Sequence, residues 1–251
     1  QPLLSVDVLR ARHDCVEAFH VDSAARMELS RLLKDVVDLE RLTNRVVQGI
    51  ALPRDLVGIR QSLVAVPAIR SIVEQMGLAM EHPLQEVLGD VDPCARVLAL
   101  ISEAIVDSPP ATLNATGVIR SGFSPELDHI VTASRDAKEW VANLEQSERK
   151  RTGIKNLKVG YNKVFGYYIE VTRSNAELVP DEYIRKQILV NAERYITPQL
   201  KEYESLILNA QEQLLEIERR IFSEVCDQVA AAAVSLLATA RALAQLDVYA
   251  G

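Results

Sequence analysis

The sequence predicts a mostly α-helical fold, in which a helical core carries two long antiparallel lever helices with a small inserted antiparallel β-sheet domain at their tip. Three observations predict it. Helical hydrophobic periodicity occupies most of the 251 residues. A β-rich stretch near residues 157–197 interrupts this periodicity. Long helical stripes lie directly before and after that stretch, so one helix would enter the insert and the other would leave it.

These breaks define the expected domains. Residues 1–125 form the helical core, and residues 126–156 form the outgoing lever helix with its hinge. Residues 157–197 form the β-rich insert, and residues 198–251 form the returning lever helix. Because 48% of the residues are apolar, a chain of this length can bury a sizeable core.

Helical spacing in the core predicts several helices, most of which begin at a proline. They are expected at 6–19, 24–48, 53–62, 67–74, 83–88 and 93–105. A short extended segment is expected at 117–123.

The outgoing lever helix has a clear start and a clear end. Ser124 is a suitable N-cap, Pro125 suits the first helical position, and Glu126 places an acid in the first turn. Thr152 and Gly153 mark the end, because glycine readily adopts the left-handed conformation that closes a helix.

The returning lever helix is expected to be unusually long. From Pro198 to about Tyr249, apolar or small residues recur in steps of three and four, and no glycine or proline interrupts them. Two successive steps of four after Ile221 act as a stutter in this repeat. A single helix of this length would measure roughly 75–80 Å.

The insert between the levers predicts a β-hairpin. Segments 157–161 and 167–172 alternate in strand fashion, and 162–166 supplies Asn and Gly for a tight connection. A third strand is expected at roughly 185–196, in a sheet of three or four strands, because two strands alone are marginal. The insert also holds six of the twelve aromatic residues, for which filling a small core is the simplest role.

Positive charge is concentrated around this insert. Residues 149–201 contain 11 basic and 5 acidic side chains, so they carry +6, while the whole chain has a net charge of -7. A positive patch on an acidic chain attracts a polyanion to one place. For any single lysine or arginine, a solvated surface position is the plain alternative.

The sequence contains no catalytic or metal-binding motif. The four histidines are scattered over separate helices without metal-ligand spacing, at His13, His20, His82 and His129. His13, Asp14 and Cys15 are consecutive, so on a helix they point in different directions and cannot form a triad.

Cys15, Cys94 and Cys226 are widely spaced and odd in number, which is typical of reduced core thiols in a cytosolic protein. We expect no membrane contact, because no apolar run reaches the length of a membrane span and no signal peptide opens the chain. The absence of an initiating methionine predicts an excised segment of a longer protein.

Long blocks of this sequence resemble the clamp of the bacterial MutS family of DNA mismatch-recognition proteins. The blocks are LKVGYNKVFGYYIEVTRSN at 157–175, LVP at 178–180, RKQ at 185–187 and NAERYITP at 191–198. Shorter similar blocks extend the resemblance over essentially the whole chain, at 1–4, 38–41, 53–56 and 246–249.

This resemblance implies a core and lever region whose β clamp closes over a DNA duplex and contacts the phosphate backbone with little sequence information. Matching positions imply backbone contacts for Arg185, Lys186, Gln187, Asn191 and Arg194. Lys158 and Lys163 are weaker candidates. Val190 stands where the family often has lysine, so one phosphate contact is expected to be absent.

The resemblance also implies partners and activities outside this chain. The family's ATPase, with its ATP and Mg, belongs to a domain that this chain lacks, because no G-x-x-x-x-G-K-[ST] loop is present. The chain is therefore not expected to be an enzyme or to hold a cofactor. Phe222-Ser223-Glu224 matches the family's mismatch-reading motif only by chance. The resemblance implies double-stranded DNA as ligand, a homodimeric parent protein, a possible MutL-type partner, and a cytoplasmic, nucleoid-associated location in bacteria.

Two functions of different classes remain. The first is a DNA clamp without sequence specificity, joined by levers to an ATPase so that nucleotide state and DNA grip are coupled. Its candidate hinges are the turns at Thr152-Gly153 and Thr197-Pro198. The second is a structural arm whose basic tip seats an acidic protein partner. Clampless relatives of the family lack the β-rich insert, so its presence favours the first.

Overall fold

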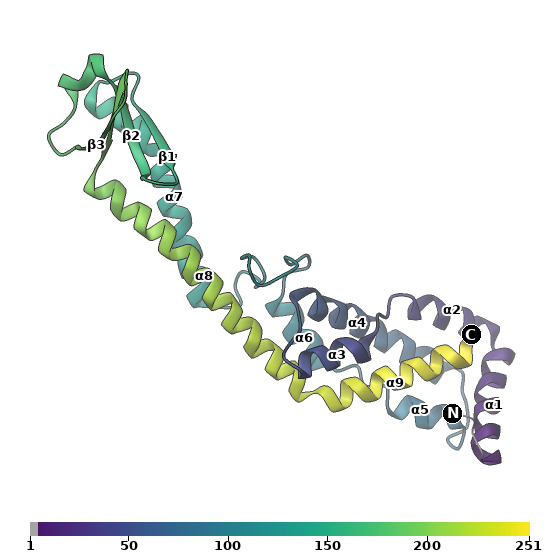
Figure 1. The fold of residues 1–251 in the computed structure, drawn as a ribbon. Helices are drawn as coiled ribbons and strands as arrows, with labels where there is room; N and C mark the ends of the chain where they lie inside the picture. Colours follow the sequence, from purple (N-terminus) through teal and green to yellow (C-terminus); the bar gives the residue numbers. More distant parts are fainter. Residues whose placement is uncertain (1–4) are drawn as a thin grey trace. The chain divides into compact units, whose positions relative to one another are not determined.

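The computed structural model describes residues 5–251, which divide into two compact units (Figure 1). Unit 1 consists of Gln1–Phe123, described from residue 5 onward, and Glu218–Gly251. Unit 2 is Ser124–Ile217. The similarity noted at residues 1–4 lies outside the described residues. The expected class, mostly α-helical with a small inserted antiparallel sheet, is confirmed.

Unit 1 is a set of helices around an apolar core. Its helices are α1 (Val6–Val21), α2 (Ser23–Leu33), α3 (Leu39–Val47), α4 (Pro53–Gln75), α5 (Pro83–Gly89), α6 (Ala95–Ala104), the end of α8 (Pro198–Ala231) and α9 (Ala233–Ala250). Large side chains with almost no exposure include Phe19, Leu29, Leu56, Ile59, Leu63, Ile69, Leu84 and Ile101. The extended segment expected at 117–123 contributes only an isolated bridge, between Ile105 and Ile119.

The single helix expected at 24–48 is wrong, because polar side chains interrupt it. Asp38 caps α3, since its carboxylate accepts a hydrogen bond from the N–H of Arg41 at 3.0 Å. The N–H of Val37 donates to the hydroxyl of Ser62 at 3.1 Å. These bonds satisfy backbone groups that a continuous helix would have bonded internally.

The helix starts expected at Pro67 and Pro93 are also wrong. Pro67 lies inside α4, where it removes a backbone hydrogen bond at a cost of about 3 kcal/mol. Full burial of Val66 and Ile69 on either side favours the continuous helix. The helix expected at 93–105 begins only at α6, because Cys94 adopts a left-handed conformation with φ 46°.

The expectation that no apolar run reaches the length of a membrane span is wrong for α4. By length and composition α4 could cross a membrane, since its best window has a mean hydropathy of 1.4. However, 44% of that window is buried inside the structure, as in the core helix of a globular unit. α8 and α9 pass the same test only when the bent pair is counted as one segment.

The single helix expected at 198–249 is also wrong. α8 and α9 meet at Ala232, where the helix bends by 65°. The N–H of Ala232 donates to the carbonyl of Val229 at 3.0 Å, which is a tighter turn than an α-helix makes. Alanine is the best helix former, so the local sequence does not mark this break. Tertiary packing explains it, because Val229 before the break and Leu236 after it are both fully buried.

A buried carboxylate holds the loop after α6 in unit 1. Glu218 on α8 is 5% exposed, and its carboxylate accepts backbone hydrogen bonds from Gly117 at 2.9–3.0 Å and from Val118 and Ile119 at 3.4 Å. Backbone donors therefore replace the water that this charge loses on burial.

Unit 2 combines two helical segments with a four-stranded antiparallel sheet. Its elements are α7 (Pro125–Thr152), β1 (Lys158–Asn162), β2 (Gly166–Thr172), the 3₁₀-helix η1 (Arg173–Leu178), β3 (Ile184–Ile188), β4 (Ala192–Ile196) and the start of α8. The strand order is β1-β2-β4-β3. The expected β1–β2 hairpin is confirmed. The single strand expected at 185–196 is wrong, because β3 and β4 form a second hairpin there.

The start and end expected for the outgoing helix are confirmed. The hydroxyl of Ser124 accepts a hydrogen bond from the N–H of Leu127 at 3.4 Å, and Pro125 occupies the first turn of α7. Gly153 ends the helix in the left-handed conformation, with φ 74°.

One face of the sheet packs on α7 and α8. Ile169 and Val171 of β2 and Tyr195 of β4 lie in one buried cluster with Leu144 of α7 and Leu200 of α8. This burial stabilises a sheet whose five- to seven-residue strands would be marginal alone.

The two helices also contact each other directly. The ring of Trp140 on α7 stacks on that of Tyr203 on α8, with centroids 4.0 Å apart and an interplanar angle of 10°. Trp140 is the only tryptophan of the chain, so its fluorescence reports on unit 2.

Side chains of α7 satisfy the open edge of β1. The carboxylate of Glu145 accepts a hydrogen bond from the N–H of Val159 at 3.0 Å. The guanidinium of Arg149 donates to the carbonyl of Leu157 at 2.7 Å and forms a 2.8 Å ion pair with Glu145. These contacts cover backbone groups that an edge strand would otherwise expose.

A buried carboxylate of α8 joins the helix to the β1–β2 turn. Glu204 is 8% exposed and accepts hydrogen bonds from the N–H of Tyr167 at 2.9 Å and from the ammonium of Lys201 at 3.0 Å. That ammonium also donates to the carbonyl of Phe165 at 3.2 Å. Gly166 has φ 75°, and a Cβ atom there would overlap the carboxylate of Glu204.

We expect Gly166→Ala to destabilise unit 2 more than the matched variant Gly153→Ala. Both glycines have φ near 75°, which costs alanine about 1–2 kcal/mol. Only at position 166 would the new methyl group also displace the carboxylate of Glu204. The free energy of unfolding should therefore fall by about 3 kcal/mol or more in Gly166→Ala. Urea unfolding followed by Trp140 fluorescence measures both, and equal losses would contradict the role assigned to Glu204.

Candidate nucleic-acid interface

The sheet turns its second face away from α7 and α8. Strand alternation and register place these side chains on it: Lys158, Tyr168, Glu170, Gln187 and Arg194. The covered face is mostly apolar, and its one charge on an inner strand is Glu193, which lies opposite the buried Val171. The other charges and amides of the sheet lie on the second face, in the turns or on the edge strands.

Arg194, an expected DNA contact, is held within the sheet. Its guanidinium donates to the carboxylate of Glu170 at 2.9 Å and to the amide oxygen of Gln187 at 3.0 Å. It also lies 4.2 Å from the ring centroid of Tyr168, and that ring fills the space above Gly160. The Arg194 side chain is only 21% exposed, so its contacts bind three strands together.

Arg185 is paired with a carboxylate, at a distance of 3.3 Å from Glu193. Glu193 also accepts a 2.6 Å hydrogen bond from the hydroxyl of Tyr195. This hydrogen bond, followed by the charges of Arg185 and Arg173, holds the pKa of Glu193 below its usual range. Burial, followed by the bond to Glu193, raises the pKa of Tyr195 to about 12.

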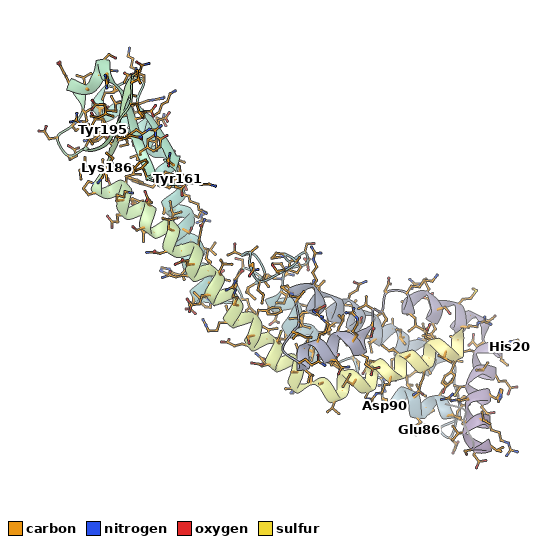
Figure 2. The ribbon with its side chains drawn as sticks, viewed as in Figure 1. His20, Glu86, Asp90, Tyr161, Lys186 and Tyr195 are labelled. Carbon is orange, nitrogen blue, oxygen red and sulfur yellow. The ribbon has the colours of Figure 1, made fainter. Side chains whose placement is uncertain are left out.

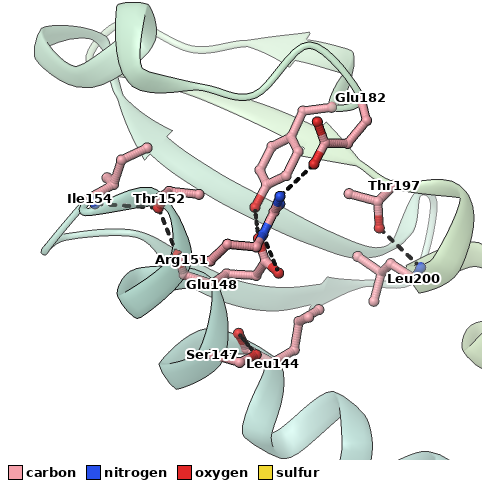
Figure 3. A network of polar contacts seen from close by, with 10 residues as sticks. Leu144, Ser147, Glu148, Arg151, Thr152, Ile154, Glu182, Thr197 and Leu200 are labelled. Atoms are coloured by element: carbon pink, nitrogen blue, oxygen red, sulfur yellow. Dashed lines mark hydrogen bonds and ion pairs between the residues drawn. The ribbon is translucent and has the colours of Figure 1, made fainter.

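A second network ties the end of α7 to the segment before β3 (Figure 3). Arg151 forms ion pairs with Glu148 at 2.7 Å and with Glu182 at 2.6 Å. The hydroxyl of Tyr183 donates to Glu148 at 2.5 Å. Burial, followed by this hydrogen bond, raises the pKa of Tyr183 well above its ordinary value. The charge of Arg151 is therefore used inside unit 2.

The four candidate hinge residues are helix ends. The hydroxyl of Thr152 donates to a carbonyl one turn earlier at 2.7 Å, and Gly153 is the C-cap of α7 (Figure 3). The hydroxyl of Thr197 accepts from the N–H of Leu200 at 3.1 Å, and Pro198 opens α8. These capping contacts account for the residue types. The hinge role stays a prediction.

Five of the eleven basic side chains at 149–201 are paired with carboxylates, and six are exposed without such a pair. The paired ones are Arg149, Arg151, Arg185, Arg194 and Lys201. The following six form no ion pair with any residue between 5 and 251: Lys150, Lys155, Lys158, Lys163, Arg173 and Lys186. Among the basic residues expected to contact DNA, Lys158, Lys163 and Lys186 are therefore available to a ligand. Arg185 and Arg194 are instead paired with carboxylates of the sheet.

Lys186 lies on the edge strand β3, where the register shifts between Arg185 and Gln187 (Figure 2). A bulge and a lysine on an edge strand both prevent pairing with another sheet. Edge protection is thus a structural role for Lys186 beside the expected DNA contact.

The β3–β4 turn presents Val190 and Asn191 to solvent. The N–H of Leu189 closes the turn by donating to the carbonyl of Ala192 at 2.8 Å. Val190 is 84% exposed, so the position at which the family often has lysine does display its side chain. The carbonyl of Asn191 accepts from the N–H of Arg173 at 3.2 Å, which places this turn beside the corner between β2 and η1.

Sequence reasoning missed a polar cluster at that corner, formed by Asn156, Thr172, Ser174 and Asn175. Asn and Ser next to strand ends are the one signal that could have suggested it, because such side chains bond locally to nearby groups. The bonds between residues 156 and 175 could not be read from the sequence.

The described residues 5–251 contain no cluster of His, Cys, Asp or Glu side chains that could hold a metal ion. The cysteines Cys15, Cys94 and Cys226 are buried and free. Burial raises the pKa of Cys15 and of Cys94 to about 11 and that of Cys226 to about 12, so all three are neutral thiols at pH 7.

Comparison with known proteins finds one family across this chain. The family model described as MutS family domain IV matches residues 122–213. The DNA mismatch repair protein MutS of Pelotomaculum thermopropionicum is 47% identical over 248 residues, covering 98% of this chain and 28% of that protein. MutS of Dehalococcoides mccartyi is 46% identical, covering 99% and 29%. MutS of Methanosarcina acetivorans is 45% identical, covering 100% and 28%. The chain therefore spans less than a third of the length of these relatives.

We expect Tyr195→Phe to raise the pKa of Glu193 toward its ordinary value, because the largest cause of its lowering is the hydrogen bond from Tyr195. A carboxylate with a lowered pKa stabilises the fold above its ordinary pKa and loses that effect as the pH falls through the lowered value. In the variant this loss should be smaller and should be complete at a higher pH. An NMR titration of the Glu193 carboxyl carbon measures the shift. The exposed Tyr161→Phe is the matched control, and an unchanged Glu193 pKa in Tyr195→Phe would contradict the assignment.

Proposed function

Because this chain belongs to the MutS family of DNA mismatch repair proteins, we propose that it grips the phosphate backbone of duplex DNA without sequence specificity, through the basic surface of its sheet. One observation carries the proposal. The six exposed cations without ion pairs all lie within 150–186, on the sheet, its turns and the adjoining helix end.

The charge of the supporting helices strengthens this argument. Residues 125–148 and 202–217, which form most of the helical part of unit 2, contain ten acidic and two basic side chains. Residues 149–201 carry +6. A duplex is therefore attracted by the sheet and repelled by the helices that hold it.

The chemistry of the available groups favours backbone contact over base reading. Five of the six are lysines, whose compact ammonium binds phosphate as a point charge. Sequence is read mainly by groups placed against base edges in the grooves, whereas phosphate contacts carry no direct sequence information. We therefore propose that this region binds matched and mismatched duplexes alike.

Coupling to an ATPase is the second part of the proposal. α8 is one helix that supplies residues to both units, and Glu204 on it bonds directly to the β1–β2 turn. This supports a rigid link between the DNA-gripping sheet and α8. We place ATP, Mg, the dimer contacts and any MutL-type partner in the remainder of the parent protein, with bending at the helix ends Thr152-Gly153 and Thr197-Pro198.

A second function, docking of an acidic protein, is favoured by one observation. The β3 edge exposes Ile184 and Ile188 by 48% and 55% on either side of Lys186. Exposed apolar side chains around a cation suit a protein surface better than a sugar-phosphate backbone. We keep this function as the alternative outcome of the experiment.

We expect the 251-residue chain to bind a fluorescent duplex with a log Kd that depends on log salt with a slope of about 3.6, if four cations contact phosphates. The triple variant Lys158→Gln, Lys163→Gln, Lys186→Gln should reduce this slope by about 2.7, because each lost contact removes about 0.9. Fluorescence anisotropy across a salt series measures both.

Arg135→Gln with Lys138→Gln, on the acidic helix α7, is the control and should leave the slope unchanged. Equal binding of matched and mismatched duplexes is expected throughout. Absence of duplex binding at low salt, together with binding of poly-glutamate, would overturn the DNA proposal and support acidic-protein docking.

A further inference from the structure

We propose an additional phosphate site on unit 2, at the corner between β2 and η1, in which the hydroxyl of Ser174 donates to a DNA phosphate between the cations Arg173 and Lys155. This inference rests on the proposed DNA binding and adds a neutral hydrogen-bond donor to it. Neither the sequence nor the family resemblance singled out any of these three residues as an individual DNA contact.

A chain of side-chain hydrogen bonds leads to Ser174. The amide of Asn175 donates to the amide oxygen of Asn156 at 2.6 Å. The amide of Asn156 donates to the hydroxyl oxygen of Thr172 at 3.0 Å, and Asn175 adds a longer bond of 3.4 Å to the same oxygen. That oxygen lies 3.2 Å from the hydroxyl oxygen of Ser174.

The donor inventory favours one direction for the last bond. The NH₂ group of an asparagine only donates, so the oxygen of Thr172 uses both lone pairs to accept from Asn156 and Asn175. It can then join Ser174 only by donating its own proton. Ser174 therefore accepts within the cluster and keeps its own proton for an outside acceptor.

Each bond in such a chain polarises the next, which makes the terminal hydroxyl a better donor. A phosphate oxygen is the matching acceptor, because hydrogen bonds from hydroxyls to anions are short and about twice as strong as neutral ones. Hydroxyl and amide groups are regular contacts of DNA phosphates, and they fix the register of a protein on the duplex.

The charges around the corner, two cations against the carboxylate of Glu177 on η1, favour an anion on balance. Lys155 and Arg173 are exposed and form no ion pair with residues 5–251. Glu193 lies close enough to Arg173 for their charges to interact. Its carboxylate is already bonded to the hydroxyl of Tyr195 and paired with Arg185, so it does not pair with Arg173.

The corner also adjoins an expected contact. The N–H of Arg173 donates to the carbonyl of Asn191 at 3.2 Å, so Ser174 and the β3–β4 turn share one end of the sheet. In this sequence the apolar side chain of Val190 cannot supply a phosphate contact at that turn. The Ser174 corner supplies donors beside it.

The test compares the salt dependence of duplex binding for two single variants of the 251-residue chain. Ser174→Ala should raise Kd about 5-fold at every salt concentration and leave the slope unchanged, because a neutral donor displaces no counterion. Arg173→Gln should raise Kd and also reduce the slope by about 0.9. Ser174→Thr keeps the hydroxyl and should bind like the unaltered chain.

Matched controls are Ser205→Ala on α8 and Arg135→Gln on α7, both exposed, which should leave Kd and slope unchanged. Unfolding followed by Trp140 fluorescence confirms that each variant is folded. If Ser174→Ala and Arg173→Gln bind like the unaltered chain while the triple lysine variant loses slope, the corner site is overturned and the proposed function stands. If the unaltered chain does not bind the duplex at low salt, the proposed function fails and the corner site fails with it.

Discussion

The burial of one face of a small sheet against two helices is the interaction on which unit 2 depends. Strands of five to seven residues bury too little apolar surface to fold alone, so Ile169 and Val171 must pack against Leu144 and Leu200. One face of the sheet must therefore be covered by α7 and α8. Apart from Glu193, which lies on the covered side and is paired with Arg185, the charged groups of the insert are then confined to the second face, the turns or the edges, which are the surfaces that a large polyanion can reach.

The carboxylates that hold the sheet in place also decide which cations are free. Glu145, Glu170 and Glu204 complete backbone or strand contacts, and each neutralises a basic neighbour while doing so. Most arginines are used in this way, because a planar guanidinium can bond several acceptors at once. Most lysines are left exposed. The division between structural arginines and available lysines follows from geometry and could not be inferred from a count of charges.

Local signals in the sequence predicted much of the fold, and long-range contacts explain the failures. The ends of α7 at Ser124 and Gly153 and the β1–β2 hairpin were predictable, because caps and turn residues act on neighbouring backbone. The β3–β4 turn was missed because residues 185–196 contain no glycine or proline, so the segment resembles one strand. The turn also forms without any residue in the left-handed conformation. The break at Ala232 lies in an alanine run that favours helix. For the site, the sequence predicted the basic region but not the pairing of Arg185 and Arg194.

Hydrogen exchange of the 251-residue chain with and without duplex DNA tests most directly the claim that this sheet surface grips the backbone. The account predicts slower exchange on DNA binding at the β3–β4 turn and at the corner around Arg173, with no change along the acidic face of α7. Protection spread along α7 and α8, or no protection in the sheet under conditions where the duplex is bound, would contradict it.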